Sequence, residues 1–474
     1  MAAEADWVLY APNPTYDRTL IHNPVSFGFA EKIGALYPNS MVVVVFQNTD
    51  GGKIISSDLE GVYVFMEKIE RNRMGMDFKK MNTTGTTGGW RVSIDRLAAI
   101  PEGMSADTVQ PNFHAAGPNG ILEIFDDQEG DSSPQPEDDV SEFYHSFLNF
   151  ANPDGYEIQT LQRNTIQADV RAMDSAVWAG NYESHLDADS WARHYAVNNF
   201  ARNNDALVLS THIYRESPSA KIKMGPVWDF DRAYTQNGSA TSSPLIYSDR
   251  DWHQGLIQNI DFKQTLQDAW QEARRTTATN SALESLVDDS VAGLRPDQIS
   301  ASGLGFSSWQ GRVSDMRNWV VARADFLDAQ YEPLPSVSPV TELFSSSVPV
   351  AMAPASGGTV YYTTDGTDPR MPGGAISLSA NAFSPLMISQ RTRIIARTLE
   401  GLSWSGKIER NYYRAEDLPQ LVISEICYHP AGPTSAETAM GYDDADDFEF
   451  IEIQNIGSNT VDLTSLVLAG GISF

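Results

Sequence analysis

The hydrophobic pattern of the first 330 residues mixes helical and strand spacing. Apolar residues at intervals of three predict a helix over 23–34. Strand-like runs follow at 41–47 and 61–66, and a further strand is expected over 88–95, after a glycine turn. This alternation of element types predicts a mixed α+β domain.

The middle of this region predicts a helical block followed by a hairpin. Aromatic and aliphatic residues are spaced by three and four over 140–204, and Asp189 or Ser190 is expected to cap the last helix of the block. The segments 208–216 and 221–230 are predicted to be two antiparallel strands, joined by a Ser-Pro-Ser-Ala turn.

Residues 261–330 return to helical spacing, and the composition changes after them. Residues 331–414 are rich in Pro, Ser, Thr and Gly and contain short alternating strands, which is typical of a small β-sandwich. Residues 420–474 form another β unit. We therefore predict an α+β domain over 1–332, followed by two small all-β, immunoglobulin-like sandwiches over 333–415 and 420–474.

Composition and charge narrow the possible partners. The 474 residues include 33 Lys and Arg against 62 Asp and Glu, which gives a formal net charge of −29. Such a surface repels phosphate backbones, so we expect no nucleic-acid partner. There is no run of about 18 apolar residues, so no transmembrane segment is expected. The sole cysteine, Cys427, excludes an internal disulfide and a cysteine-paired metal site.

Both ends of the chain are abrupt. Residues 6–10 already have the pattern of a strand, and no basic segment followed by an apolar core precedes them. We therefore recognise no signal peptide. The last residues stop in the same interrupted way, and we expect truncation at both ends.

The segment with the most chemical content covers residues 203–234. It places Asp205 before one expected strand, and Asp229 and Asp231 just after the next. Because the ends of hairpin strands meet, the three carboxylates are expected to converge. Phosphoryl transfer uses such a set, in which one carboxylate orients or deprotonates the acceptor hydroxyl and others hold divalent ions. Acidic residues at strand ends also serve as turn formers or salt-bridge partners, so the spacing alone leaves both interpretations open.

Several motifs resemble the CotH kinase family, and they occur in the same order along the chain as in that family. The segment KMGPVWDFDRAY, which contains Asp229 and Asp231, is similar to the signature of that family. Gly61, Tyr63 and Glu67 match its G-x-Y-x-x-x-E element. The resemblance covers about residues 6–330 and rests on the segments 17–34, 61–67, 191–217 and 223–234.

The resemblance implies a compact, atypical protein-kinase-like fold that binds ATP and Mg²⁺ and phosphorylates serine hydroxyls of a protein acceptor. By position, Asp205 becomes the catalytic base. Asp229 becomes the principal metal ligand, with Asp231 beside it. Glu67 is placed in or near the nucleotide pocket by its motif.

Two departures from the kinase pattern leave the activity of this chain open. Kinase catalytic loops usually supply an Asn five residues after the Asp as a second metal ligand, and Ser210 stands at that position. In addition, the family carries a basic residue for the phosphates on a strand upstream of the start of this chain. Lys53, Lys68 and Arg91 are available, but none lies in a motif that assigns it this role.

The C-terminal segments resemble accessory modules. YYTTDGTDPR, residues 361–370, is similar to the C-terminal β-sandwich repeat of chitobiase and hexosaminidase proteins. Residues 421–471 resemble a lamin-tail domain without its closing strands. Such modules accompany secreted bacterial enzymes, so they imply an extracellular or envelope setting and a cell-surface glycan or protein as an additional partner.

Two other functions remain open from the sequence. One is a non-catalytic scaffold, a pseudokinase whose β modules dock surface glycans or proteins, and Ser210 and the missing upstream strand favour it. The other is a polysaccharide-active hydrolase, suggested only by the chitobiase-type module. No pair of carboxylates with glycosidase spacing can be named in its support.

Overall fold

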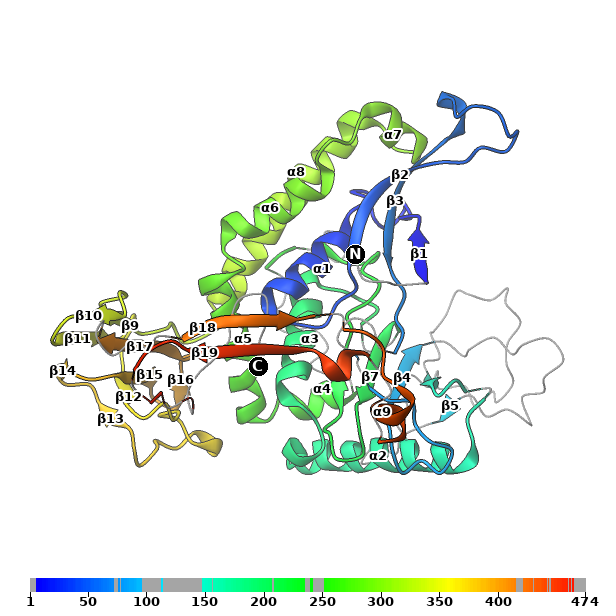
Figure 1. The fold of residues 1–474 in the computed structure, drawn as a ribbon. Helices are drawn as coiled ribbons and strands as arrows, with labels where there is room; N and C mark the ends of the chain where they lie inside the picture. The colour runs from blue at the N-terminus through cyan, green and yellow to red at the C-terminus, as the bar shows by residue number, and fades with distance from the viewer. Residues whose placement is uncertain are drawn as a thin grey trace.

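Two small sheets and a group of helices make up the first two thirds of the chain, and β-strands dominate the rest (Figure 1). The computed structural model describes residues 6–71, 76, 78–95, 112–113, 147–155, 157–206, 209–234, 239–241, 251–414, 421–428, 430–440, 442, 445–458, 460–461 and 463. Within these ranges the chain is a mixed α+β protein with a β-rich C-terminal part. Among the described residues, no helix combines the length and the apolar content that crossing a bilayer requires.

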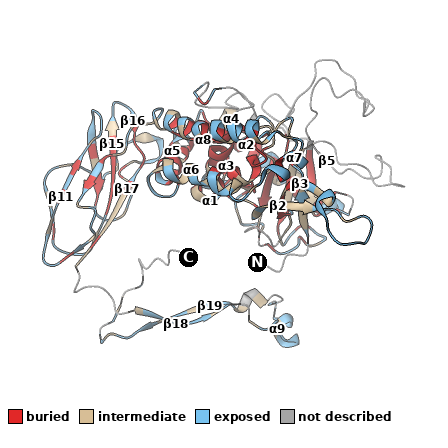
Figure 2. Cartoon of the chain, turned by 90° about the horizontal axis from the view of Figure 1, so that it is seen from above, coloured by how far each residue is buried: buried red, intermediate tan, exposed pale blue. Residues whose placement is uncertain are grey.

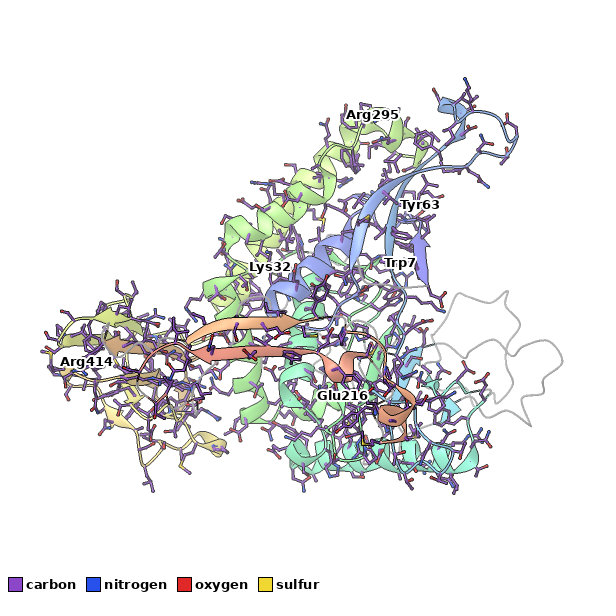
Figure 3. The ribbon with its side chains drawn as sticks, viewed as in Figure 1. Trp7, Lys32, Tyr63, Glu216, Arg295 and Arg414 are labelled. Carbon is purple, nitrogen blue, oxygen red and sulfur yellow. The ribbon has the colours of Figure 1, made fainter. Side chains whose placement is uncertain are left out.

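The first sheet has three antiparallel strands in the order β1-β3-β2. Its strands and the helix between the first two are β1 (Trp7–Tyr10), α1 (His22–Ile33), β2 (Ser40–Phe46) and β3 (Leu59–Glu67), with the short 3-10 helix Ser56–Asp58 before β3. Trp7 stacks on Phe65 across the sheet at a centroid distance of 4.6 Å, and Trp7 and Tyr63 mark the two strands in Figure 3. The predicted helix over 23–34 and both predicted strands are confirmed.

The second sheet has the order β5-β6-β4-β7-β8. Its strands are β4 (Trp90–Asp95), β5 (Asn112–Phe113), β6 (Phe147–Asn152), β7 (Thr211–Arg215) and β8 (Lys223–Met224). Buried and half-buried residues alternate along β4, as expected for a strand with one face on the core. The predicted hairpin is confirmed, because β7 and β8 pair antiparallel. Its second strand is shorter than predicted and ends at Met224, before Pro226, which has no N–H to donate.

With the exception of one short helix, α7, the helices pack around one large hydrophobic core that also takes in both sheets. Ile299 of α7 (Pro296–Ala301) joins a smaller core with Val62 and Trp309. They are α2 (Thr160–Ala179), α3 (Ala188–Ala201), α4 (Asp251–Leu256), α5 (Ile260–Thr276), α6 (Asn280–Val291), α7 (Pro296–Ala301) and α8 (Phe306–Asp328), with a 3-10 turn at Tyr182–Ser184. Helix α3 is the most central of them, because its residues 194–201 are all buried. Its N-cap is Asp187, whose carboxylate accepts the backbone N–H of Ser190 at 2.9 Å. The predicted cap at Asp189 or Ser190 was therefore wrong by two or three residues.

Two sheets that share a second, smaller core form the next part of the chain. One has the order β10-β17-β15-β12-β13, with β16 paired to β15, and the other has the order β14-β11-β9. The strands are β9 (Ser336–Ser338), β10 (Leu343–Phe344), β11 (Val348–Ala353), β12 (Thr359–Thr363), β13 (Asn381–Ala382), β14 (Leu386–Ile388), β15 (Thr392–Glu400), β16 (Ser403–Trp404) and β17 (Ile408–Arg414), with a 3-10 turn at Pro372–Gly374. We call this part the β-rich unit. Its immunoglobulin-like character stays a prediction.

The last described segment is an extended two-stranded ribbon. Strands β18 (Leu421–Cys427) and β19 (Phe450–Asn455) pair antiparallel, and the short helix α9 (Ser435–Ala439) and a 3-10 turn, Ala445–Phe448, lie between them. Ile423, Ile426 and Phe450 are exposed on it, and Figure 2 shows the ribbon set apart from the rest of the molecule. The described residues thus show one hairpin of the predicted lamin-tail module, whose identity stays a prediction.

Helix α5 joins the N-terminal α+β region to the β-rich unit through a buried ion-pair network. Its apolar face, with Phe262, enters the main core, while Asp268 points to Arg397 of β15. The two side chains form a bidentate pair with both N–O distances at 2.6 Å. Asp368 holds the same guanidinium at 2.8 and 2.6 Å. Only 1% of the Arg397 side chain is exposed. Asp268 and Asp368 together bond to all three nitrogens of this buried guanidinium and compensate its charge.

Glutamine side chains extend this contact along the same helix. Gln264 donates to the carbonyl of Ser405 at 3.1 Å, and Gln267 donates to the carbonyl of Trp404 at 3.1 Å. Gln271 accepts the backbone N–H of Gly406 at 2.7 Å. Each bond satisfies a backbone group of the β16 turn, so α5 acts as a template for that turn.

We predict that Asp268→Ala lowers the free energy of unfolding by about 3 kcal/mol, because it leaves a buried guanidinium with one carboxylate instead of two. Urea titration followed by tryptophan fluorescence measures this. The matched control is Glu409→Ala, which removes the carboxylate of a bidentate pair with Arg393, an arginine that is 50% exposed. We expect it to cost less than about 1 kcal/mol. Equal losses in the two variants would contradict the proposed importance of burial.

Candidate active site

The turn after β8 carries Asp229 and Asp231 between buried anchors. Val227 and Phe230 are fully buried, and the backbone N–H of Val227 donates to the carbonyl of Leu36 at 2.8 Å. Phe230 packs edge-on against Phe27 of α1 at 6.2 Å. These apolar residues fix the turn in the core, so Asp229, which lies between them, and Asp231, which directly follows Phe230, emerge from a rigid segment.

Buried polar side chains hold the backbone of this turn. The Asn203 amide nitrogen donates to the carbonyl of Asp229 at 3.0 Å. Asn23 accepts the backbone N–H of Phe230 at 2.9 Å. On the other side, Nδ1 of His22 lies 3.0 Å from the carbonyl oxygen of Asp231. The turn is therefore bonded to the start of α1 and to the segment that follows α3.

Asn203 also positions the segment of Asp205. Helix α3 ends at Arg202, which takes a left-handed conformation, and the backbone N–H of Asn203 then donates to the carbonyl of Asn198 at 3.1 Å. The Asn203 side-chain oxygen faces the backbone N–H of Asp205 at 3.3 Å. One buried carboxamide thus links the loop of Asp205 to the turn of Asp229.

The surroundings of Asp229 disfavour its charged form. Burial is the main cause, and repulsion from Asp231 and Asp205 adds to it, so that the pKa of Asp229 rises from its ordinary value of 3.8 to about 6. The hydroxyl of Ser210 donates to Oδ2 at 3.4 Å and the N–H of Asp231 donates to Oδ1 at 3.5 Å. Bonds of this length do little to offset burial and repulsion.

Asp231 and Asp205 belong to the same electrostatic cluster. Burial and then repulsion from Asp205 raise the pKa of Asp231, while Arg232 acts in the opposite direction. Arg232 is also the ion-pair partner of Asp205, with Nη1 3.6 Å from Oδ1. The structure therefore brings together the three aspartates that the sequence singled out, and it adds one arginine.

Ser210 lies where the sequence comparison with kinase loops placed it, beside Asp229. Both residues have left-handed backbones, with φ of +54° and +55°. Asp tolerates this region better than most residues, whereas for Ser210 it is uncommon. The Ser210 hydroxyl contacts the carboxylate of Asp229 directly, so it is available on the same side of the cluster.

Asp17 is a buried carboxylate of this region that sequence reasoning missed. Its Oδ1 accepts the N–H and the hydroxyl of Thr19 at 3.0 and 2.7 Å, and its Oδ2 accepts the N–H of His22 at 2.8 Å. Nε2 of His22 lies 3.4 Å from Asp17. Its charge also contributes to the raised pKa of Asp231. The Asp-x-Thr spacing just before a helix is a turn and capping signal that could have identified it.

Glu67 is buried away from the aspartate cluster. Its Oε2 accepts the backbone N–H and the side-chain amide of Asn39 at 2.8 and 3.0 Å. Among the described residues, no hydrogen bond or ion pair joins Glu67 to Asp205, Asp229 or Asp231. A role for Glu67 at the nucleotide stays a prediction.

The basic residues considered from the sequence lie elsewhere. Lys53 is exposed on the β2–β3 connection. Lys68 is 53% exposed and pairs with Glu70 at 2.8 Å. Arg91 is inside the second sheet, where Nη1 lies 3.2 Å from Nδ1 of His212 and Nη2 donates to the carbonyl of Ile69. None of these contacts reaches the aspartates.

The donor set fits a divalent cation of the Mg²⁺ type. Two carboxylates two residues apart, Asp229 and Asp231, repel each other, and a cation between them would relieve that repulsion. Within the described ranges, no group of three or more His, Cys, Asp or Glu side chains is arranged to hold a metal ion. Mg²⁺ usually takes only one or two protein carboxylates and fills its remaining positions with water and phosphate oxygens, so two carboxylates are sufficient.

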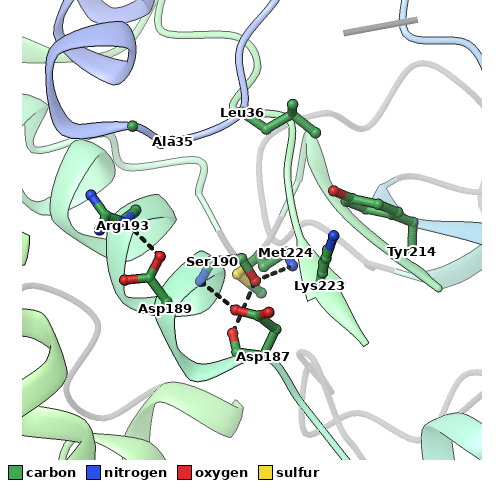
Figure 4. Close-up of a pocket in the computed structure, with 10 residues that line it drawn as sticks. Ala35, Leu36, Asp187, Asp189, Ser190, Arg193, Tyr214, Lys223 and Met224 are labelled. Carbon is green, nitrogen blue, oxygen red and sulfur yellow. Dashed lines mark hydrogen bonds and ion pairs between the residues drawn. The ribbon is translucent and has the colours of Figure 1, made fainter. Parts of the chain in front are cut away.

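Two cavities lie near the cluster without including it. One, of about 290 Å³, is lined by the loop after α1, the start of α3 and the β7–β8 hairpin (Figure 4). Two of its polar side chains are bonded to neighbouring residues: the Ser190 hydroxyl donates to the carbonyl of Asp187 at 2.9 Å, and Arg193 donates to the carboxylate of Asp189 at 2.7 Å. The other, of about 450 Å³, lies between α1, α6 and the start of β2 and includes Asn39 among its walls.

Comparisons with known proteins agree with the kinase-like geometry at the family level. The family model described as CotH kinase protein matches residues 4–327. No match is found among curated proteins. The crystal structure of the Helicobacter pylori proinflammatory kinase CtkA is similar at 10% identity over 68% of this chain and 91% of that chain. The TM-score is 0.25.

We predict that Asp229→Asn stabilises the protein when divalent ions are removed. The folded-state pKa is raised, so the ionised carboxylate destabilises the fold above about pH 6, and this penalty disappears as the pH falls towards 3.8. The expected gain is about 1–2 kcal/mol at pH 7.5, allowing for solvent around a half-buried group. At pH 4 we expect no difference.

Chemical denaturation at both pH values, in the presence of a chelator, measures this effect. Asp315→Asn, on the exposed side of α8, is the matched control and should change nothing. A variant that gains no stability at pH 7.5, or that gains as much at pH 4, would show that Asp229 is not electrostatically strained.

Proposed function

The chain belongs to the CotH kinase family, and from this premise we propose that it transfers the γ-phosphate of ATP to serine hydroxyls of a protein acceptor in the presence of Mg²⁺. The observation that carries the proposal is the linkage of Asp205 and Asp229 through Asn203. Phosphoryl transfer depends mainly on positioning and on charge neutralisation. A shared buried amide supplies positioning, and the paired carboxylates supply the donors for a neutralising cation.

We assign Asp205 the role of proton acceptor. As the oxygen–phosphorus bond to the acceptor forms and the bond to the departing ADP breaks, the hydroxyl proton passes to the Asp205 carboxylate. Asp229 and Asp231 would hold Mg²⁺, with the Ser210 hydroxyl beside them. The bound ion would neutralise charge on the phosphate oxygens. We place Glu67 near the nucleotide, because its motif suggests this position.

A non-catalytic scaffold is the second candidate function. It is favoured by the positions of Lys53, Lys68 and Arg91, none of which contacts the aspartates, and by the hydroxyl of Ser210 where a carboxamide is usual. In this case the β-rich unit and the ribbon would dock a cell-surface glycan or protein, and ATP would have no effect on docking.

We further propose that the protein acts outside the cell or in the cell envelope. The support is the resemblance of residues 361–370 and 421–471 to modules that accompany secreted proteins. The proposed domain boundaries are 1–332, 333–415 and 420–474. The bidentate pair of Asp268 on α5 with Arg397 on β15 joins residues of the first two proposed units.

We predict that the wild-type chain binds ATP only with Mg²⁺, and that Asp229→Ala weakens this binding at least about tenfold, the usual loss for one charge-assisted contact. Isothermal titration calorimetry measures both. Asp205→Ala should bind Mg²⁺ and ATP like the wild type but transfer labelled phosphate about 10²- to 10⁴-fold more slowly. Asp315→Ala is the matched control. If the protein binds a partner equally well with and without ATP, and binds no ATP itself, the scaffold function is favoured.

A further inference from the structure

The aspartate cluster carries much more negative than positive charge. Repulsion from Asp205 and Asp17 raises the pKa of Asp231, and repulsion from Asp231 and Asp205 raises that of Asp229. A nucleotide triphosphate would add several further negative charges. Mg²⁺ offsets part of this charge, but kinases also place a basic side chain on the phosphates. The described ion pairs bring one arginine to the cluster, Arg232.

Arg232 is held at this position by two different contacts. It directly follows Asp231 in the chain, and its guanidinium lies over the ring of Tyr16, 4.7 Å from the ring centre. Nη1 lies 3.6 Å from Oδ1 of Asp205, which is longer than a hydrogen bond. A stacked, planar guanidinium is already oriented, so it loses little conformational freedom when it binds an anion.

Accessibility also suits a ligand-binding role for this arginine. The side chain of Arg232 is 31% exposed, and that of Asp205 is 15% exposed. The guanidinium therefore lies at the solvent side of the cluster, in contrast to the buried Arg397 and the half-buried Arg91, which are held in structural contacts. The ion pair of Nη1 with Oδ1 of Asp205 is long, and an ion pair of this kind between partly exposed groups contributes little free energy.

We propose that Arg232 binds the γ-phosphate of ATP, in the place of the basic residue that neither Lys53, Lys68 nor Arg91 supplies. This inference rests on the proposed function. We assign the γ-phosphate and not another phosphate because Arg232 contacts Asp205, the proposed proton acceptor. The acceptor hydroxyl must lie beside Asp205, and the transferred γ-phosphate must lie beside that hydroxyl. Arg232 makes and breaks no covalent bond. Its guanidinium leaves Asp205 and binds phosphate oxygens. The Asp205 carboxylate can then accept the proton of the acceptor hydroxyl.

The test compares two nucleotides that differ only at the γ position. Calorimetry with Mg²⁺ measures the affinities of ADP and of a non-hydrolysable ATP analogue for the wild type, Arg232→Ala and Arg232→Lys. We expect Arg232→Ala to lose about 10- to 100-fold in affinity for the ATP analogue, the range for a charged hydrogen bond, and to stay within about threefold for ADP. Arg232→Lys should fall between Arg232→Ala and the wild type.

Three further variants test whether the effect is specific to Arg232. Arg312→Ala, which removes an exposed arginine that pairs with Asp315 on α8, should leave both affinities unchanged. Tyr16→Phe should retain the preference for the ATP analogue because the ring remains, whereas Tyr16→Ala should reduce it. Thermal unfolding of each variant without nucleotide shows whether Arg232 is needed for folding.

The outcomes separate this inference from the function on which it rests. If the wild type binds both nucleotides and Arg232→Ala weakens both equally, or neither, then Arg232 is a structural ion-pair partner and the inference is overturned while the kinase function stands. If the wild type binds no nucleotide with Mg²⁺, both are overturned. Selective loss of the ATP analogue supports both.

Discussion

The arrangement of the candidate site depends on the buried side chain of Asn203. Its amide nitrogen bonds to the carbonyl of Asp229 and its oxygen faces the N–H of Asp205, so the two segments cannot move independently. The same nitrogen lies 3.1 Å from the side-chain oxygen of Asn198, inside α3. A misplacement of about 1 Å can cost a hundredfold in rate, and this network constrains both carboxylates against such a shift.

The network is stable because the helix that supports it is buried on all sides. Residues 194–201 of α3 are buried, with Phe200 stacked on Phe29 of α1 at 4.1 Å. Helix α5 packs against α3 on one face and binds the β-rich unit through Asp268 and Arg397 on the other. The β-rich unit is thus connected to the candidate site through two rigid helices, and its removal would expose the polar face of α5.

This rigid support also explains how the protein tolerates like charges close together. Burial and repulsion raise the pKa of Asp229 to about 6. Packing of the surrounding core keeps Asp229 in this unfavourable position, and the free energy of that packing offsets the electrostatic cost. Perturbed carboxylates that are held in this way are characteristic of functional sites, although structural networks can produce them as well. The family match over residues 4–327 favours the functional explanation.

Local patterns predicted many of the elements and the three aspartates, but not the contacts between distant residues. The helical prediction over 140–204 was wrong at its start, where the structure has the strand β6. The helix near 23–34 and the β7–β8 hairpin follow from periodicity and turn residues. The cap of α3 was misassigned because Asp187, Asp189 and Ser190 are all good capping residues and only geometry distinguishes them. The bond of Asn203 to Asp229 spans 26 residues and that of Asp268 to Arg397 spans 129. Arg232 was overlooked for the same reason, because its significance comes from Tyr16 and Asp205, which are distant in sequence.

The central claim is that the Asp229 turn holds a divalent cation together with a nucleotide. A crystal structure of the chain grown with Mn²⁺ and a non-hydrolysable ATP analogue tests it directly, because Mn²⁺ gives an anomalous signal that locates the ion without reference to a model. We predict an anomalous peak within bonding distance of a carboxylate oxygen of Asp229, with phosphate density beside it. Nucleotide bound elsewhere, or Mn²⁺ absent from Asp229 under saturating conditions, would contradict the account.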